Sequence, residues 1–391
     1  MCKAPGVPAE PLHQSQLAVA VDATALLGVR TGVGRFVEGA LGALAGVSTV
    51  TLSAFAVSWR RRRRLPGLLP PGVVARQRAM PARPLHAAWG RGSLPPAEWF
   101  LGPVDVVHGT NFVVPPTRRA ARVVTVHDLT PVRFPELCDP ASLAFPGLVR
   151  RAVAAGAWVH TPSAFVAGEV MEAFGAPAER VRAVHHGIPR LWLPSPDDSS
   201  GGAPVALPAG CRRIVLAIGT VEPRKDYPGL VAAFEQVAAA RPDVALVVAG
   251  PDGWGSEQLR QVLAASPARH QVVRAGYVPE QQLGALLASA AVLAYPSRYE
   301  GFGFPPLEAM QAGVPVVATA AGAVGEVVGD AGLLVPPGDP DALADALACA
   351  LDDDDRRASL VAAGRRRAAA FTWEACAGGL SRLYAEAAAD R

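Results

Sequence analysis

The amino-acid sequence predicts an α/β protein made of two doubly wound units, each with a parallel sheet covered by helices on both faces. Three observations support this prediction. The chain has 391 residues, which is too long for one ordinary hydrophobic core. Short apolar segments alternate with helical patterns in both halves, as is typical of parallel sheets. A stretch rich in Ser, Pro, Asp and Gly at residues 193–204 divides the chain almost in half, as a linker does.

The composition is that of a folded globular protein. Half of the residues are hydrophobic and 18% are charged, which argues against a disordered chain. The net charge of +3 is too small to indicate a nucleic-acid partner. Five scattered cysteines without C-x-x-C spacing favour a reducing compartment over a disulfide framework or a zinc site. We find no secretory signal and no apolar run of about 18 residues, so we expect a cytoplasmic protein and leave open its peripheral attachment to the inner face of a membrane.

The first half opens with an apolar strand at residues 17–22 and a glycine-rich turn that contains Gly32 and Gly34. A helical pattern follows to about residue 45. Such a turn at a helix start can bind phosphate, but a tight turn with glycines at positive φ explains it equally well. Helices are also expected at residues 141–155 and 164–174, and further strands at residues 51–57, 104–108, 123–127, 158–161 and 181–184.

Polar side chains follow two of these strands directly. Ligands of open α/β sheets bind at the carboxyl ends of the strands, which selects Asn111 after one strand and His127 with Asp128 after the next. His127 has a structural alternative, a histidine held by hydrogen bonds in the core. Asp128 has another, since an aspartate can cap the segment that follows.

Five consecutive arginines, from Arg60 to Arg64, form the main charge cluster. Such a run usually belongs to a solvated loop. The nearby leucines and tryptophans, among them Trp59, Trp89 and Trp99, make a patch for an anionic membrane surface the next interpretation. Nucleic-acid binding is disfavoured because no recognition module accompanies the run.

The second half repeats the alternation of strands and helices. Strands are expected at residues 214–219, 244–250, 272–275, 291–295, 314–319 and 332–335, and helices at 228–240, 256–264, 279–288 and 307–312. The predicted domains are an N-terminal domain at residues 1–193, a linker at 194–212, a C-terminal domain at 213–370 and a final helical segment at 371–391.

Residues 296–310 join a strand to a helix and carry the densest set of candidate site residues. Gly301 and Gly303 allow the backbone to approach a ligand, and two prolines suit the first helical positions. The unpaired N–H groups of that helix start can bind an anion such as phosphate. Glu300 and Glu308 flank the turn, so we expect both carboxylates near one cleft. For Glu308 the alternative is a helix-dipole role.

A second candidate anion site follows the first strand of this half. Arg224 and Lys225 place two adjacent cations where an open sheet binds its ligands. Together with the helix start after Gly303 they can hold a diphosphate without a metal. The alternative is a solvated loop in which Arg224 pairs with Glu222 or Asp226.

These motifs resemble those of the retaining glycosyltransferases of family 4. The segment E-G-F-G-F-P-P-L-E at residues 300–308 looks like the E-x7-E signature of that family, and residues 219–225, 276–278, 323–330 and 371–373 match its pattern in the same order. The resemblance implies the GT-B architecture, two Rossmann-like domains that face a cleft, with the last helix crossing back to the first domain. It also implies a nucleotide-diphosphate sugar bound by the C-terminal half.

The resemblance also assigns roles residue by residue. Glu308 would bind the ribose hydroxyls and Glu300 would lie against the donor sugar, while Arg224 and Lys225 would neutralise the diphosphate. His127 matches a histidine near the donor sugar, and Asp128 and Asn111 would lie on the acceptor side. The other donor-binding positions would be Gly32, Gly34, Gly219, Thr220, Val278, Gly301, Phe302 and Gly303. One position departs from the family, because many members carry arginine where this sequence has Thr220.

The expected activity is transfer of a sugar with retention of configuration and without a metal cofactor. We expect GDP-mannose as donor and a glycan or lipid-linked acceptor in bacterial polysaccharide or glycolipid assembly, with closure about a hinge near residues 194–204. No carboxylate can be assigned as a covalent nucleophile, so attack from the side of the leaving group is favoured. The alternatives are a non-catalytic protein that binds nucleotide sugars and a nucleotide-sugar epimerase on the same fold.

Overall fold

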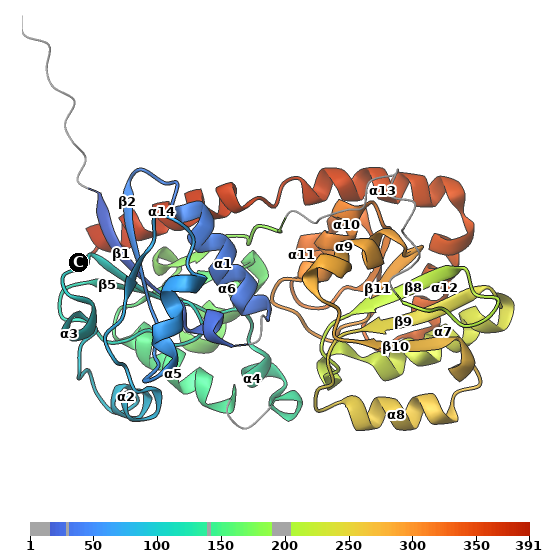
Figure 1. Ribbon diagram of the computed structural model, residues 1–391, viewed down its shortest axis with the longest axis horizontal. Helices are drawn as coiled ribbons and strands as arrows, with labels where there is room; N and C mark the ends of the chain where they lie inside the picture. Colours follow the sequence, from blue (N-terminus) through green and yellow to red (C-terminus); the bar gives the residue numbers. More distant parts are fainter. Residues whose placement is uncertain (1–15, 29–30, 139–141, 190–204) are drawn as a thin grey trace, which may run out of the picture.

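The computed structural model describes residues 16–28, 31–138, 142–189 and 205–391. It contains two parallel sheets in two domains, and the predicted fold class is confirmed (Figure 1). Most of the predicted linker, residues 194–204, lies outside the described residues.

The N-terminal domain is built on a seven-stranded sheet with the order β3-β2-β1-β4-β5-β6-β7. Every pair in it is parallel. The order reverses beside β1, because β1 pairs with both β2 and β4, and such a reversal opens a crevice at the carboxyl ends of the strands. The strands are β1 (Leu17–Asp22), β2 (Val50–Phe55), β3 (Val74–Arg76), β4 (Val106–Gly109), β5 (Ala121–Thr125), β6 (Trp158–Thr161) and β7 (Val181–Ala183).

Helices cover both faces of this sheet. Val19 and Val21 of β1 pack into one apolar cluster, and Ala20 between them packs into another on the opposite face, as the two-residue period of a strand requires. The helix α6 has a defined start and end, since Ser163 accepts a hydrogen bond from Val166 N and the helix stops at a left-handed glycine. The helices are α1 (Gly32–Leu44), α2 (Ala82–Trp89), α3 (Glu98–Leu101), α4 (Thr130–Arg133), α5 (Phe145–Ala154) and α6 (Ala164–Phe174).

The C-terminal domain repeats the design with a six-stranded parallel sheet of order β10-β9-β8-β11-β12-β13. Its strands are β8 (Arg213–Ile218), β9 (Val244–Ala249), β10 (Val272–Gly276), β11 (Val292–Tyr295), β12 (Val316–Thr319) and β13 (Leu333–Val335). Its helices are α7 (Tyr227–Ala240), α8 (Ser256–Ala265), α9 (Glu280–Ala288), α10 (Phe304–Ala312), α11 (Val324–Val328), α12 (Pro340–Asp352) and α13 (Asp354–Ala368).

The last helix, α14 (Trp373–Ala389), returns to the N-terminal domain, as the resemblance implied (Figure 1, red). Leu380 and Tyr384 of this helix are buried in the same apolar cluster as Phe36 of α1. The indole of Trp373 packs against α1 at Gly39, where a Cβ atom would lie 2.1 Å from the ring. The crossover therefore depends on a glycine in the middle of α1.

The arginine run is solvated, as the sequence predicted, but most of it forms a helical turn instead of a loop. Residues Arg61–Leu68 form a 3-10 helix, and the short strand β3, which was not predicted, follows it. Leu65 is fully buried and holds this turn against the domain while the arginines around it stay largely exposed. One buried leucine beside five arginines gives no helical period of apolar residues. The hydrophobic pattern of the sequence therefore could not predict this 3-10 helix.

Candidate active site

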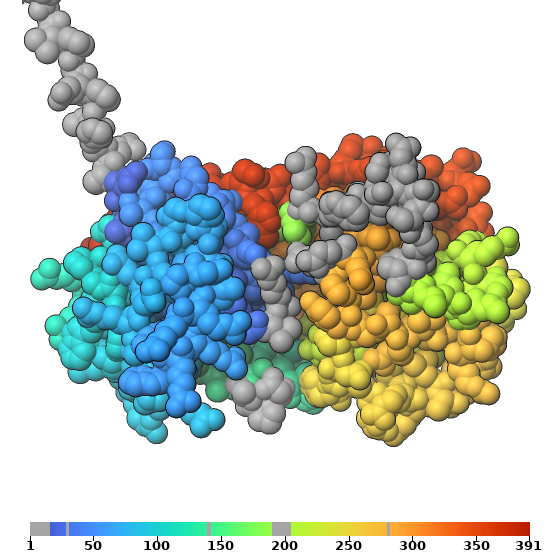
Figure 2. Space-filling model, in the orientation of Figure 1, coloured from blue at the N-terminus to red at the C-terminus, as the bar shows by residue number. Residues whose placement is uncertain are grey.

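A cleft of about 410 Å³ lies between the two domains, and residues from both line it. Figure 2 shows the domains as two lobes side by side, joined along the top by the C-terminal segment in red. The lining includes four segments: the glycine turn at the start of α1, the end of β5, the turn after β8 and the turn between β11 and α10. All four segments leave the carboxyl ends of parallel strands, the edge where open α/β sheets bind their ligands.

Glu300 is bound by both predicted cations. Lys225 Nζ lies 2.5 Å from Glu300 Oε1, and Arg224 Nη1 lies 2.7 Å from Glu300 Oε2. Burial alone would raise the pKa of Glu300, but Arg224 and Lys225 outweigh it and lower that pKa to about 2. Burial lowers the pKa of Lys225, and Glu300 opposes this shift. The three groups form a buried ionic unit with one net positive charge at neutral pH.

The turn that carries Arg224 and Lys225 is fixed by close backbone contacts. Tyr227 Oη donates to Gly219 O at 2.9 Å, and a Cβ atom on Gly250 would lie 2.0 Å from that same oxygen. Arg224 also donates to Tyr299 O at 3.0 Å and lies 3.5 Å from Glu222 Oε2. The alternative pairing with Glu222 is thus present, but as the longer of two ion pairs.

The turn between β11 and α10 is held by the opposite domain. Tyr299 Oη accepts a hydrogen bond from Leu129 N at 3.0 Å and donates one to Glu169. Ser163 Oγ donates to Gly301 O at 2.9 Å. A Cβ atom on Gly301 would lie 1.8 Å from His127 O, so only glycine fits there. The position of Glu300 therefore depends on contacts between the domains.

Glu308 differs from the prediction that both carboxylates reach the cleft. It lies in α10, is buried and is not among the residues that line the cleft. Its carboxylate pairs with Arg35 of α1, and Arg35 is the group that lines the cleft at this place. Sequence analysis did not select Arg35. The sequence did contain a signal for Arg35, since it is a cation that directly follows the glycine turn predicted to bind phosphate.

His127 lies at the cleft with a defined protonation pattern. Its Nε2 atom is 2.8 Å from Thr110 O, and because a carbonyl only accepts, Nε2 carries the proton. Burial lowers the pKa of His127, so the ring is neutral and Nδ1 is an acceptor. A histidine that accepts at Nδ1 can orient a sugar hydroxyl. Asp128 also lines the cleft, and its Oδ1 accepts from Thr130 N at 2.9 Å, as its capping alternative expected.

The remaining predicted residues divide into two groups. Those that line the cleft are Gly32, Gly219, Thr220, Val278, Gly301, Phe302 and Gly303. Asn111 and Gly34 are absent from the lining: Asn111 forms an isolated bridge with Val113, and Gly34 is buried within α1. Thr110, the neighbour of Asn111, does not line the cleft either, but the Thr110 carbonyl accepts the hydrogen bond from His127.

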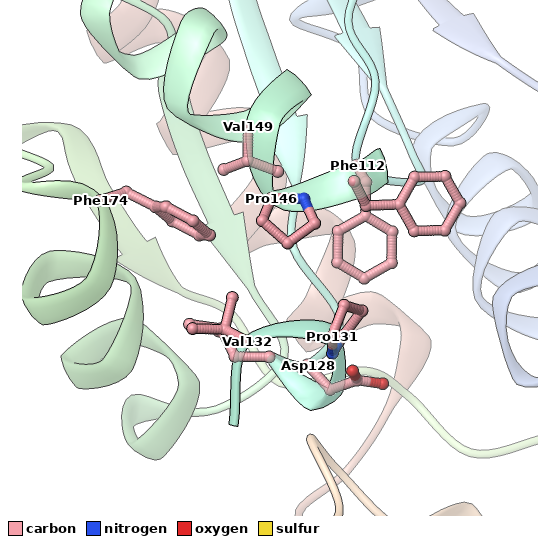
Figure 3. A pocket seen from close by; sticks show the side chains of 9 residues that line it. Phe112, Asp128, Pro131, Val132, Pro146, Val149 and Phe174 are labelled. Atoms are coloured by element: carbon pink, nitrogen blue, oxygen red, sulfur yellow. The ribbon is translucent and has the colours of Figure 1, made fainter. Parts of the chain in front are cut away.

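A second hollow lies beside Asp128 and is apolar. Figure 3 shows Phe112, Pro146, Val149 and Phe174 around it, with the carboxylate of Asp128 at one side. Its volume of about 10 Å³ is enough for about one water molecule, so it is too small for a sugar.

His186, which sequence analysis missed, also lines the cleft. Its ring stacks on Phe36 at 4.2 Å and on Phe304 at 5.7 Å, so it lies between α1 and α10. Neither ring nitrogen has a hydrogen-bond partner within the described part of the chain. Burial lowers the pKa of His186 well below its usual value, and the ring is neutral. Its position in an irregular segment after β7 gave no sequence signal.

Two further features are absent from the described residues. No helix among them is long and apolar enough to cross a membrane. No group of three or more His, Cys, Asp or Glu side chains in the same residues is arranged to hold a metal ion.

The family models match the two domains separately. Residues 31–190 match "Glycosyltransferase Family 4", and residues 206–367 match "Glycosyl transferases group 1". The O-antigen chain mannosyltransferase B of Escherichia coli is 32% identical over 273 residues, which are 69% of this chain and 71% of that protein. The D-inositol 3-phosphate glycosyltransferase of Thermobispora bispora is 34% identical over 232 residues, 56% of this chain and 54% of that protein.

Solved structures share the fold over nearly the whole chain. Anabaena HepE in complex with UDP and glucose superposes with a TM-score of 0.71 at 19% identity and covers 94% of this chain and 99% of its own. WaaG, a glycosyltransferase involved in lipopolysaccharide biosynthesis, gives a TM-score of 0.66 at 17% identity over 94% and 99%. The chain therefore belongs to glycosyltransferase family 4, with the GT-B fold and the general activity of that family, sugar transfer from a nucleotide sugar in glycan biosynthesis.

Proposed function

We propose that this protein is a retaining mannosyltransferase that uses GDP-mannose and works without a metal cofactor. The similarity to an O-antigen chain mannosyltransferase supports the sugar. The observation that carries the proposal is the ionic unit of Glu300, Arg224 and Lys225 at the cleft. Both cations line the cleft together with the start of α10, whose N-cap Gly303 has φ 115°. This arrangement suits a diphosphate that gains negative charge as its bond to the sugar breaks.

The chemistry proposed for the site follows from where charge develops. In an oxocarbenium-like transition state the sugar gains positive charge and the diphosphate gains negative charge. Glu300, ionised because its pKa is about 2, would stabilise the sugar, and Lys225 and Arg224 would stabilise the diphosphate. These interactions strengthen as the bond breaks, which lowers the barrier. The acceptor would attack from the side of the leaving group and pass its proton to a phosphate oxygen, with Nδ1 of His127 orienting a sugar hydroxyl.

The test is a donor screen with product analysis. GDP-mannose, UDP-glucose, UDP-N-acetylglucosamine and dTDP-rhamnose are incubated with the protein and a glycan acceptor, with and without EDTA, and release of nucleoside diphosphate is measured. We expect release from GDP-mannose that EDTA does not reduce, and an α-linked product by NMR. Binding without release would favour a non-catalytic binding protein, and a changed sugar that keeps its nucleotide would favour an epimerase.

We also propose that the N-terminal domain docks on an anionic membrane to reach a lipid-linked acceptor. Residues 60–119 contain eleven arginines and two acidic residues, whereas the whole chain has a net charge of only +3. Trp59 and Trp99 are more than half exposed in the same region, and the Arg118 guanidinium lies over the Trp99 ring. Arginines near anionic headgroups contribute about 1 kcal/mol each. In liposome flotation we expect binding to phosphatidylglycerol vesicles and none to phosphatidylcholine vesicles. Equal recovery with both would contradict the proposal.

A further inference from the structure

Arg35 separates the carboxylate of Glu308 from the cleft. The two side chains pair across the domain boundary, from α1 to α10. The Glu308 side chain is 1% exposed, whereas that of Arg35 is 24% exposed and lines the cleft. A ligand in the cleft therefore meets the guanidinium first, and it reaches the carboxylate only if Arg35 moves.

The two partners of this pair prefer different parts of one ligand. A carboxylate accepts hydrogen bonds, and two adjacent hydroxyls such as those of a ribose are matched donors for it. A guanidinium only donates, and it binds phosphate oxygens through two parallel N–H groups. A nucleoside diphosphate carries both a ribose diol and a diphosphate, so it can satisfy both residues after they separate.

We propose, on the basis of the proposed function, that donor binding breaks the ion pair between Arg35 and Glu308. Glu308 then accepts hydrogen bonds from the ribose diol, and the released Arg35 binds the diphosphate. We call this change the exchange. Arg35 is thus a donor-binding residue supplied by the N-terminal domain. The exchange also accounts for Thr220, which lines the cleft where many family members carry arginine. Arg224 does not fill that role freely, because it is held by Glu300 and by Tyr299 O.

The exchange predicts opposite effects on two classes of ligand. In Arg35→Gln the affinity for GDP and UDP should fall about tenfold or more, because a charge-assisted contact to the diphosphate is lost. The affinity for guanosine and uridine should stay unchanged or rise, because the ion pair between Arg35 and Glu308 no longer has to be broken. Calorimetry measures the diphosphates and NMR titration the nucleosides. The control is Arg260→Gln, which removes an exposed arginine paired with Glu257 on α8 and should bind all four ligands like the wild type.

Arg35→Gln removes a cation that is paired with a buried carboxylate and can unfold the protein. Arg35→Lys is then the informative variant, because it keeps a charge beside Glu308 while losing the bidentate contact to phosphate. It should bind GDP and UDP less tightly and the nucleosides as well as before. Equal losses for nucleosides and diphosphates, or unchanged diphosphate affinity, would overturn the exchange alone. A wild-type protein that binds neither diphosphate would refute both the exchange and the proposed function.

Discussion

Glu300 sets the net charge of the site, because its carboxylate pairs with both Arg224 and Lys225. It neutralises one of two cations that lie within 2.7 Å of its oxygens, and with a pKa of about 2 it is ionised at neutral pH. The cations therefore remain next to each other in the buried site without full mutual repulsion. Removing the carboxylate charge leaves both of them for the diphosphate.

We expect Glu300→Gln to lower turnover by about 100-fold or more, because the developing positive charge on the sugar loses its counterion. The affinity for GDP or UDP should stay the same or increase, since Arg224 and Lys225 lose their competitor. Initial rates and calorimetry measure the two effects. Glu222→Gln is the matched control, because Glu222 lies 3.5 Å from Arg224 and is more exposed. Turnover equal to the wild type in Glu300→Gln would remove Glu300 from the mechanism.

At the level of single residues, much of the site could be predicted from the sequence. The residue that was missed belongs to a pair whose members are far apart along the chain. The turns after the strands selected His127, Arg224, Lys225 and Glu300, because strand ends and glycine turns are local patterns. Arg35 was missed because its partner Glu308 lies 273 residues away. Neither periodicity nor turn chemistry carries information about such a pair.

At the level of elements, the C-terminal crossover segment is held against the N-terminal domain by its packing on α1. Gly39 and Gly42 lie three residues apart on this helix but meet different surroundings. A Cβ atom at Gly39 would overlap the Trp373 ring, whereas one at Gly42 would have no atom within 4 Å. The two glycines thus form a matched pair for the same substitution.

Gly39→Ala should destabilise the protein by about 1–3 kcal/mol, because the indole must shift out of a packed position. Gly42→Ala should stabilise it by about 0.5–1 kcal/mol, since alanine loses less conformational entropy than glycine in a helix. The midpoints of urea unfolding measure both changes. Equal midpoints for the two variants would show that Trp373 adapts to the extra methyl group.

Elements with local start and stop signals were predicted well, and short ones were not. The helix α6 was expected at residues 164–174 and has those bounds, because a serine cap and a left-handed glycine define it. The strand β11 was expected one residue longer at its start. The strand β3 and the helix α3 have three and four residues, too few for any period to emerge.

At the scale of the whole molecule, buried neutral histidines make the fold sensitive to acid. His108, His160 and His186 are buried and surround Phe36. Burial lowers the pKa of each, and that of His160 falls to about 3. In the unfolded chain these rings titrate near 6.5. Below that pH the unfolded state binds more protons than the folded state, so folding stability falls as the pH falls.

We expect the urea midpoint to decrease from pH 7.5 to pH 5.0, and below about pH 6.5 the loss should approach about 1.4 kcal/mol per pH unit for each histidine that stays neutral. Glu300 adds to the loss only below about pH 4.5, because its folded pKa is about 2. Asp22 opposes it between about pH 6 and 4, because burial raises its pKa to about 6. His186→Leu should reduce the slope, and the exposed His270→Gln should not. A midpoint that does not change with pH would contradict this account.

The return of α14 has a consequence for how the protein is made. Leu380, Leu383 and Tyr384 complete the apolar cluster that contains Val19 and Phe36. The two groups are more than 340 residues apart in the sequence. The first domain therefore leaves the ribosomal exit tunnel with one apolar face uncovered. That face stays exposed throughout translation of the second domain, and exposed apolar surface makes a nascent chain prone to aggregation unless a chaperone covers it.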